Sequence, residues 1–189
     1  LTGAFNIGSD GYSAQGAKEI GQVAIFDYAL SSTQISYLYN SGTPQNPMAI
    51  SGNAPIAYYP LGGSSTGSAS TLTSPNESVP SATVFDFESG DTTFIKAFDV
   101  PVTTFTECTF SAWVKFETVT GTYQYVMGMG SGPGNFMSIS KDQNSGAWYT
   151  YDGTGSDYTA STPVANRWYH VVVTQTGTTR RFYIDGIED

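Results

Sequence analysis

The chain is poor in the residues that form covalent cross-links and carry most acid–base catalysis. It has one cysteine and one histidine in 189 residues. Cys108 has no partner for a disulfide within the chain, and its place in the apolar run FTECTFSAW predicts a buried thiol. His170 lies between bulky residues in RWYHVVVT, which favours a structural histidine over a catalytic base. No serine–histidine–aspartate triad and no phosphate-binding loop can be recognised from the spacing.

Positive charge and long apolar segments are also scarce. Seven basic residues against sixteen acidic ones give a net charge of −9. An acidic surface repels phosphate backbones and anionic lipids, so we expect no nucleic-acid partner and no binding to anionic membranes. No apolar run approaches the roughly 20 residues of a membrane span, and no signal-peptide pattern follows Leu1. We therefore expect no membrane insertion.

What the chain has in quantity is glycine, tyrosine and turn residues. It contains 21 glycines, nine prolines and 13 tyrosines, with only 12% charged residues. From residue 84 onward, short apolar segments such as CTFSAWVKF (108–116) and YQYVMGMG (123–130) alternate with turn segments such as GSGPG and QNSG. Many short strands at this spacing, in a chain of single-domain length, predict an all-β sandwich or jelly roll.

One short helix is expected near residues 32–40. Ser31-Ser32-Thr33 can cap it, apolar residues follow at helical spacing, and Gly42 is the expected stop. The segment 43–55, with three prolines, is predicted to be a linker. The serine-, threonine- and glycine-rich segment 62–83 is predicted to be a long surface loop.

The two ends of the chain look complementary. RRFYIDGIED (180–189) predicts a strand that runs into an Asp185-Gly186 turn, and LTGAFNIGSDG (1–11) predicts the strand that should follow. We therefore expect a chain divided inside a domain, with residues 5–8 antiparallel beside residues 181–185.

Several motifs resemble the laminin G-like, concanavalin A-like lectin/glucanase jelly rolls. They are IAYYPLGG (56–63), FSAWVKF (110–116), RWYHVVVTQTGTTRRFYIDG (167–186), FNIGSDG (5–11) and IGQVAIFDYALSSTQISYLYN (20–40). The resemblance implies a concanavalin A-like jelly-roll sandwich of two antiparallel sheets. It covers nearly the whole chain in a circularly permuted order, and it implies that Trp113 and Trp168 pack in the core.

The permuted order suggests a domain organisation. Residues 1–42 would be the C-terminal strands and helix of one repeat, 43–55 a linker, and 56–189 the N-terminal majority of the next repeat. The segment 71–87 also resembles tandem repeats in structural proteins of marine phages. We expect residues 1–42 to complete the sandwich of their own chain, giving a monomer, while a strand-exchanged dimer stays open.

The segment AWYTYDGTGSDY (147–158) is the candidate ligand-binding site. Strand alternation places Trp148 and Thr150 on one face and Tyr149 and Tyr151 on the other, one face being core and the other solvent. An exposed ring stacks on the apolar face of a sugar while nearby polar groups bond its hydroxyls. The alternative is that these tyrosines only stabilise the sheet. The predicted ligand-binding residues are Trp148, Tyr149, Tyr151, Asp152, Asp157 and Tyr158.

Metal binding is weakly indicated. Several lectin-like jelly rolls carry calcium, so the resemblance leaves calcium open, with Asp152 and Asp157, or Asp142 and Asn144, as donors. Two side chains within five residues fall short of the six to eight oxygens that calcium takes, and such residues usually serve turn geometry. We predict no cofactor and no metal site.

Catalysis is not expected either. The glucanase branch of this superfamily uses a Glu-x-Asp-x-(x)-Glu strand, and this sequence has none. The expected function is a non-catalytic recognition or adhesion module of a larger repeat protein, extracellular or on a virion surface, with a glycan or cell-surface polysaccharide as partner. A structural spacer in a phage or cell-surface fibre is the main alternative. A glycosidase is the third, and it would need two carboxylates about 5–10 Å apart.

Overall fold

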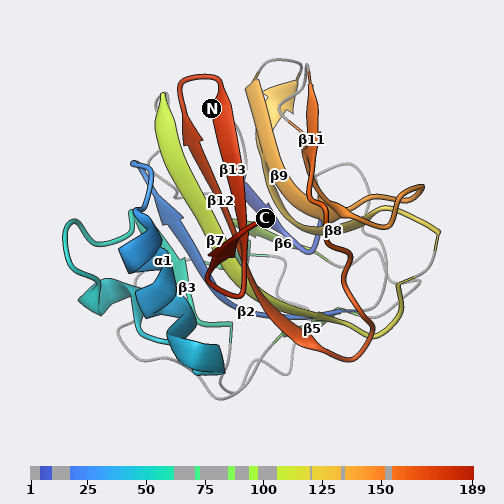
Figure 1. The fold of residues 1–189 in the computed structure, drawn as a ribbon, viewed down its shortest axis with the longest axis horizontal. Coiled ribbons are helices and arrows are strands. Elements are labelled where there is room, and N and C mark those ends of the chain that lie inside the picture. Colours follow the sequence, from blue (N-terminus) through green and yellow to red (C-terminus); the bar gives the residue numbers. More distant parts are fainter. Residues whose placement is uncertain are drawn as a thin grey trace.

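A computed structural model shows two β-sheets packed face to face, with one α-helix outside the second sheet (Figure 1). The structure describes residues 5–9, 18–61, 71–72, 85–87, 94–97, 106–119, 121–132, 135–151 and 155–189.

The first sheet holds the strands that carry the candidate site. Its order from edge to edge is β11 (Ser156–Tyr158), β10 (Trp148–Tyr151), β9 (Asn135–Lys141), β8 (Gln124–Gly132), β1 (Phe5–Ile7), β6 (Ile95–Ala97) and β4 (Thr71–Leu72). Its neighbouring strands are antiparallel except β4 and β6, which pair in parallel.

The second sheet holds the long central strands. Its order is β14 (Ile187–Glu188), β13 (Thr179–Ile184), β12 (Trp168–Thr176), β7 (Glu107–Phe116), β2 (Lys18–Phe26) and β3 (Ala57–Tyr59), and β5 (Phe85–Phe87) also pairs with β2. All of these pairs are antiparallel. The predicted all-β sandwich is confirmed.

The main core fills the space between the sheets. Phe5 from the first sheet stacks on Tyr59 and meets the edge of Phe110, both from the second sheet, at ring distances of 6.1 and 6.0 Å. The thiol of Cys108 is fully buried in this core, and burial raises its pKa to about 12. The buried thiol predicted for this position is confirmed.

Helix α1 (Ser32–Tyr39) covers the outer face of the second sheet (Figure 1). A capping box of Ser31 and Gln34 begins it, as residues of this type at this spacing favour. It ends at Asn40, whose φ of 41° is left-handed, rather than at Gly42. Ile35 and Leu38 pack onto the sheet in a second, smaller core.

Segment 43–55, predicted to be a linker, is packed against the helix and the second sheet. It follows the short helix η1 (Asn40–Gly42) and contains the short helix η2 (Pro47–Ala49). The Gln34 side chain donates to the carbonyl of Ser51 at 2.7 Å, and the Tyr28 hydroxyl donates to the carbonyl of Asn53 at 2.7 Å. Ile50 joins the smaller core. These contacts fix a segment that the sequence predicted to be flexible.

The N-terminal strands occupy interior positions in both sheets. β1 lies between β6 and β8 of the first sheet, and β2 lies between β7 and β3 of the second. The prediction that residues 5–8 pair with residues 181–185 is therefore wrong. Within this chain residues 5–9 and 18–42 form one sandwich with the later strands; the tandem-repeat origin and the monomeric state stay predictions.

The strand that pairs with the end of β13 is β14, which directly follows it in the sequence. Asp185 and Gly186 have φ values of 52° and 80°, the positive values that a tight two-residue hairpin turn needs. β14 then pairs with the end of β13, with Ile184 opposite Ile187. The turn was predicted correctly, but the strand after it begins at Ile187 instead of coming from the N-terminus.

Of the predicted surface loop 62–83, the structure describes only residues 71–72, which form β4. Among the described helices, none is long and apolar enough to cross a membrane.

Candidate functional site

The alternation of β10 places its tryptophan inside and its tyrosines outside. Trp148 and Thr150 are fully buried between the sheets. Tyr149 and Tyr151 project from the opposite, outer face of the first sheet, as alternation along a strand requires. The sequence left open which face was core, and the structure decides it.

Trp148 therefore does not offer a ring to solvent, and its inclusion among the ligand-binding residues is corrected. Its indole packs at 5.5 Å from the ring of Phe116 and at 5.4 Å from that of Tyr169, both from the second sheet. A large ring on the inner face of an outer strand fills the gap to the facing sheet. Its role here is structural.

The outer face carries a row of four residues across four strands, three of which are tyrosines. Tyr125 of β8 lies opposite Ser140 of β9, Ser140 opposite Tyr149 of β10, and Tyr149 opposite Tyr158 of β11. Residues directly opposite each other in neighbouring strands share a face. Neighbouring strands are about 4.8 Å apart, so this row spans about 14 Å.

Two more tyrosines flank the row, and together the five form what we call the tyrosine face: Tyr123, Tyr125, Tyr149, Tyr151 and Tyr158. The ring of Tyr149 lies 5.8 Å from Tyr123, 6.4 Å from Tyr151 and 5.2 Å from Tyr158, and Tyr123 lies 6.0 Å from Tyr125. Tyr149 is only 7% exposed because its neighbours surround it, whereas Tyr158 is 53% exposed. Tyr149 thus supports the outer rings, which remain accessible.

Two hydroxyl groups of the tyrosine face are held in their neutral form by their surroundings. Burial raises the pKa of the Tyr149 hydroxyl. It also raises the pKa of Tyr123, with a further contribution from the carboxylate of Asp142. Asp142 itself is held in a turn: its Oδ2 accepts the backbone N–H groups of Asn144 and Ser145, at 3.0 and 2.7 Å. Burial works to raise the pKa of Asp142, but these hydrogen bonds lower it overall. Asp142 and Asn144, considered above as calcium ligands, thus shape a turn.

Asp157 lies on the other side of its strand from Tyr158. It is opposite Thr150, and its Oδ2 binds the Nε of Arg180 on β13 at 2.5 Å. This ion pair links the edges of the two sheets, so Asp157 does not join the tyrosine face and its predicted place in the site is corrected. Asp152 lies outside the described residues.

With this geometry in place, comparison with known proteins gives one result. A family model described as the concanavalin A-like lectin/glucanases superfamily matches residues 88–189. The chain belongs to this superfamily. Comparisons with curated proteins and with solved structures gave no significant match. The resemblance to phage repeats finds no support in these comparisons.

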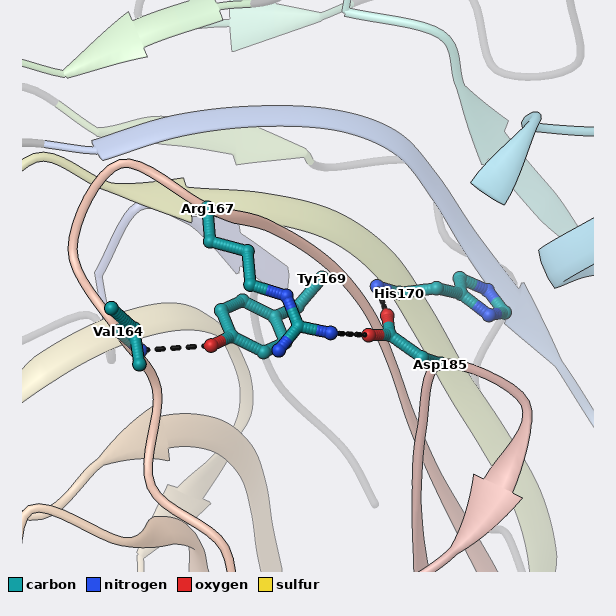
Figure 2. Close-up of polar contacts among 5 residues, drawn as sticks. All are labelled: Val164, Arg167, Tyr169, His170 and Asp185. Carbon is teal, nitrogen blue, oxygen red and sulfur yellow. Dashed lines mark hydrogen bonds and ion pairs between the residues drawn. The ribbon is translucent and has the colours of Figure 1, made fainter. Parts of the chain in front are cut away.

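The concanavalin A-like superfamily includes both lectins and glucanases, and a glucanase needs acid–base residues that a substrate can reach. His170 is 1% exposed, its Nε2 lies 2.9 Å from the Oγ of Ser111, and burial lowers its pKa to about 3. Its backbone N–H donates to Asp185 at 2.9 Å (Figure 2). A neutral imidazole closed off from solvent has no access to a substrate, in agreement with the structural role predicted for it. Within the described residues, no cluster of three or more potential metal ligands occurs.

In this concanavalin A-like sandwich, sequence reasoning missed two members of the tyrosine face. Tyr123 and Tyr125 precede β9 and are more than twenty residues from Tyr149, and only the strand register brings them together. The alternation of YQYVMGMG could have placed both on one face. It could not have shown that β8 lies next to β9 and β10 in this order.

Proposed function

We propose that the chain is a non-catalytic recognition module that binds a glycan on the tyrosine face. The face presents accessible rings at Tyr158, Tyr151 and Tyr123, and the apolar C–H faces of a sugar can stack on such rings. The phenol hydroxyls supply donors and acceptors for sugar hydroxyls. We propose that the module lies outside the cell or on a virion surface, where it can meet a glycan or cell-surface polysaccharide.

The observation that carries this proposal is the register of the tyrosine row. Aromatic residues placed only to stabilise a sheet would not need the register of four neighbouring strands to bring rings from β8, β10 and β11 to one outer face, with Tyr158 half exposed. A row of about 14 Å runs across the strands and is long enough to contact several units of an extended polymer. Binding would be shallow and weak at one module, and several linked modules would raise avidity through effective concentration.

The electrostatic surroundings favour an uncharged glycan. The chain carries a net charge of −9, and the carboxylate of Asp142 lies beside Tyr123 at the tyrosine face. Anionic polysaccharides would meet repulsion at this surface. We therefore propose neutral polysaccharides as the ligand class.

The test is affinity gel electrophoresis of the chain through a panel of soluble neutral and anionic polysaccharides. We expect retardation by at least one neutral polymer and loss of it in the double variant Tyr123→Ala/Tyr158→Ala. At about 1 kcal/mol for each aromatic contact, each substitution weakens binding about fivefold. The control is Tyr37→Ala, which removes a comparably exposed tyrosine from α1.

Three outcomes would contradict the proposal in different ways. No binding to any polysaccharide at millimolar sugar concentration, even by a multivalent assembly of the module, would favour a structural spacer. Release of reducing sugar from a bound polymer would instead show a glycosidase. Retardation that persists unchanged in the double variant would place the binding site elsewhere on the chain.

A further inference from the structure

A concave pocket lies at the edge of the sandwich, between the β13–β14 hairpin and the segment that leads into β12. We call it the Arg167 pocket. Its volume is about 430 Å³, within the range of small-ligand sites. Its lining includes Thr162, Val164, Arg167, Ile187, Glu188 and Asp189. None of these belongs to the tyrosine face.

Arg167 is held in place although its side chain is 60% exposed. Its guanidinium lies 4.5 Å above the ring of Tyr169, and its Nη2 is 2.8 Å from Oδ2 of Asp185 (Figure 2). Tyr169 is fixed in turn, because its hydroxyl accepts the backbone N–H of Val164 at 2.9 Å. Asp185 is fixed by the backbone N–H of His170. These contacts orient the guanidinium before any ligand arrives.

The fixed guanidinium has donors left for a ligand. A guanidinium carries five N–H groups, and among the described residues its hydrogen-bond partner is the single carboxylate of Asp185. The remaining donors suit an acceptor oxygen on a ligand. Because the side chain is pre-oriented, little conformational entropy is lost when it binds.

The charge of the pocket disfavours an anion as that ligand. Three carboxylates line it, those of Asp185, Glu188 and Asp189, against one guanidinium. Asp185 already neutralises Arg167, and Glu188 is paired with Arg181 at 2.5 Å. A carboxylate or phosphate ligand would meet the remaining charge of Asp189. A neutral carbonyl avoids this repulsion and still accepts from Arg167.

The rim of the pocket also presents apolar surface. Val164 is 59% exposed and Ile187 is 73% exposed, and they belong to the few large apolar side chains that the described residues leave exposed. Both line the pocket, together with the partly buried Ile184. A ligand that carries a methyl group beside its carbonyl would contact the Arg167 guanidinium and the apolar surface together. Its hydroxyl and amide N–H groups would find hydrogen-bond partners in Thr162, Glu188 and Asp189.

We propose that the Arg167 pocket is a second carbohydrate site that recognises a neutral N-acetylated amino sugar. The acetamido carbonyl accepts from Arg167, its N–H donates to a pocket carboxylate, and its methyl group packs against Val164 and Ile187. The sugar hydroxyls bond to the polar rim. This site is independent of the tyrosine face, and either can exist without the other.

The test is a titration of the isotope-labelled chain followed by nuclear magnetic resonance, with N-acetylglucosamine, glucose and glucuronate as separate probes. We expect N-acetylglucosamine to shift the backbone signals of residues 161–169 and 184–189, with glucose and glucuronate at least tenfold weaker. The variant Val164→Ser/Ile187→Ser changes exposed side chains only and should weaken N-acetylglucosamine about tenfold. Tyr37→Ala, which alters an exposed tyrosine of α1 outside both sites, should leave this affinity unchanged.

Each other outcome overturns the assignment in a recognisable way. Equal binding of glucose would show that the acetamido group is not recognised, and tighter binding of glucuronate would show an anion site. An N-acetyl-lysine peptide that binds as well as the sugar would exclude an amino-sugar site. Shifts confined to β8, β10 and β11 would remove the Arg167 pocket as a sugar site and leave the tyrosine face in place.

Discussion

The outer faces of the two sheets both carry aromatic clusters, but only one is covered. On the second sheet, His170 lies 5.2 Å from Trp113 and 6.3 Å from Tyr39, which α1 supplies. Trp113 is 7% exposed there and His170 is 1% exposed. On the first sheet Tyr158 remains 53% exposed, and α1 lies against the other sheet (Figure 1). Outward aromatic residues are thus buried or exposed according to whether another element covers them.

The largest expected effect on stability comes from weakening the packing of α1 against the second sheet. Ile35→Ala removes a fully buried side chain between α1 and the second sheet. It should lower the free energy of unfolding by about 2–5 kcal/mol, because it loses apolar burial and leaves a cavity. Urea denaturation followed by tryptophan fluorescence measures this. Tyr37→Ala on the same helix is the control, with an expected change within about 0.5 kcal/mol. Equal losses in the two variants would show that α1 is not a structural cover.

The next effect is the pH dependence of stability that His170 causes in the covered aromatic cluster of the second sheet. The pKa of His170 is lowered to about 3 in the folded chain by burial, against about 6.5 when unfolded. Between these values the unfolded chain binds more protons, so stability falls as pH falls, by up to about 1.4 kcal/mol per pH unit. His170→Gln removes this contribution.

Urea denaturation of the parent protein and of His170→Gln between about pH 7 and pH 5 isolates the contribution of His170, since most carboxylates stay ionised in that range. The unfolding free energy of the parent protein should fall more steeply on acidification than that of His170→Gln. Parallel pH profiles would mean that the imidazole is protonated, and therefore hydrated, in the folded chain.

The sequence predicted the fold more fully than the site, for reasons visible in particular residues. Strand alternation and turn residues mark most strands, and the capping residues at 31–33 mark the start of α1, where Ser31 is the N-cap. Both are local patterns, and both were confirmed. Trp148 shows where local patterns stop, because core and binding surfaces use the same aromatic residues. Only Phe116 and Tyr169, on the facing sheet, decide that Trp148 is core.

The pairing of strands was the second feature that local sequence patterns did not predict. The Asp185-Gly186 turn was recognised, but the strand after it was sought at residues 5–8 instead of 187–188. A two-residue strand carries little pattern of its own. Trp168 illustrates the same limit: expected in the core, it is only partly buried and lies 5.7 Å from the Lys115 ammonium. Its position follows from where β12 begins relative to β7, which no local pattern specifies.

The smallest effect is expected on the open tyrosine face. Tyr158→Ala removes a ring that is already half exposed at the edge strand β11, so the free energy of unfolding should change by less than about 0.5 kcal/mol. Tyr149→Ala, at the centre of the same face, removes a ring that is 7% exposed and should cost about 1–3 kcal/mol. Urea denaturation of both variants gives the contrast. A site selected for binding tolerates loss of its outer ring without loss of stability, whereas an aromatic cluster present only to stabilise the sheet does not. A stability loss in Tyr158→Ala as large as that in Tyr149→Ala would therefore place the tyrosine face with the covered cluster, as structural packing.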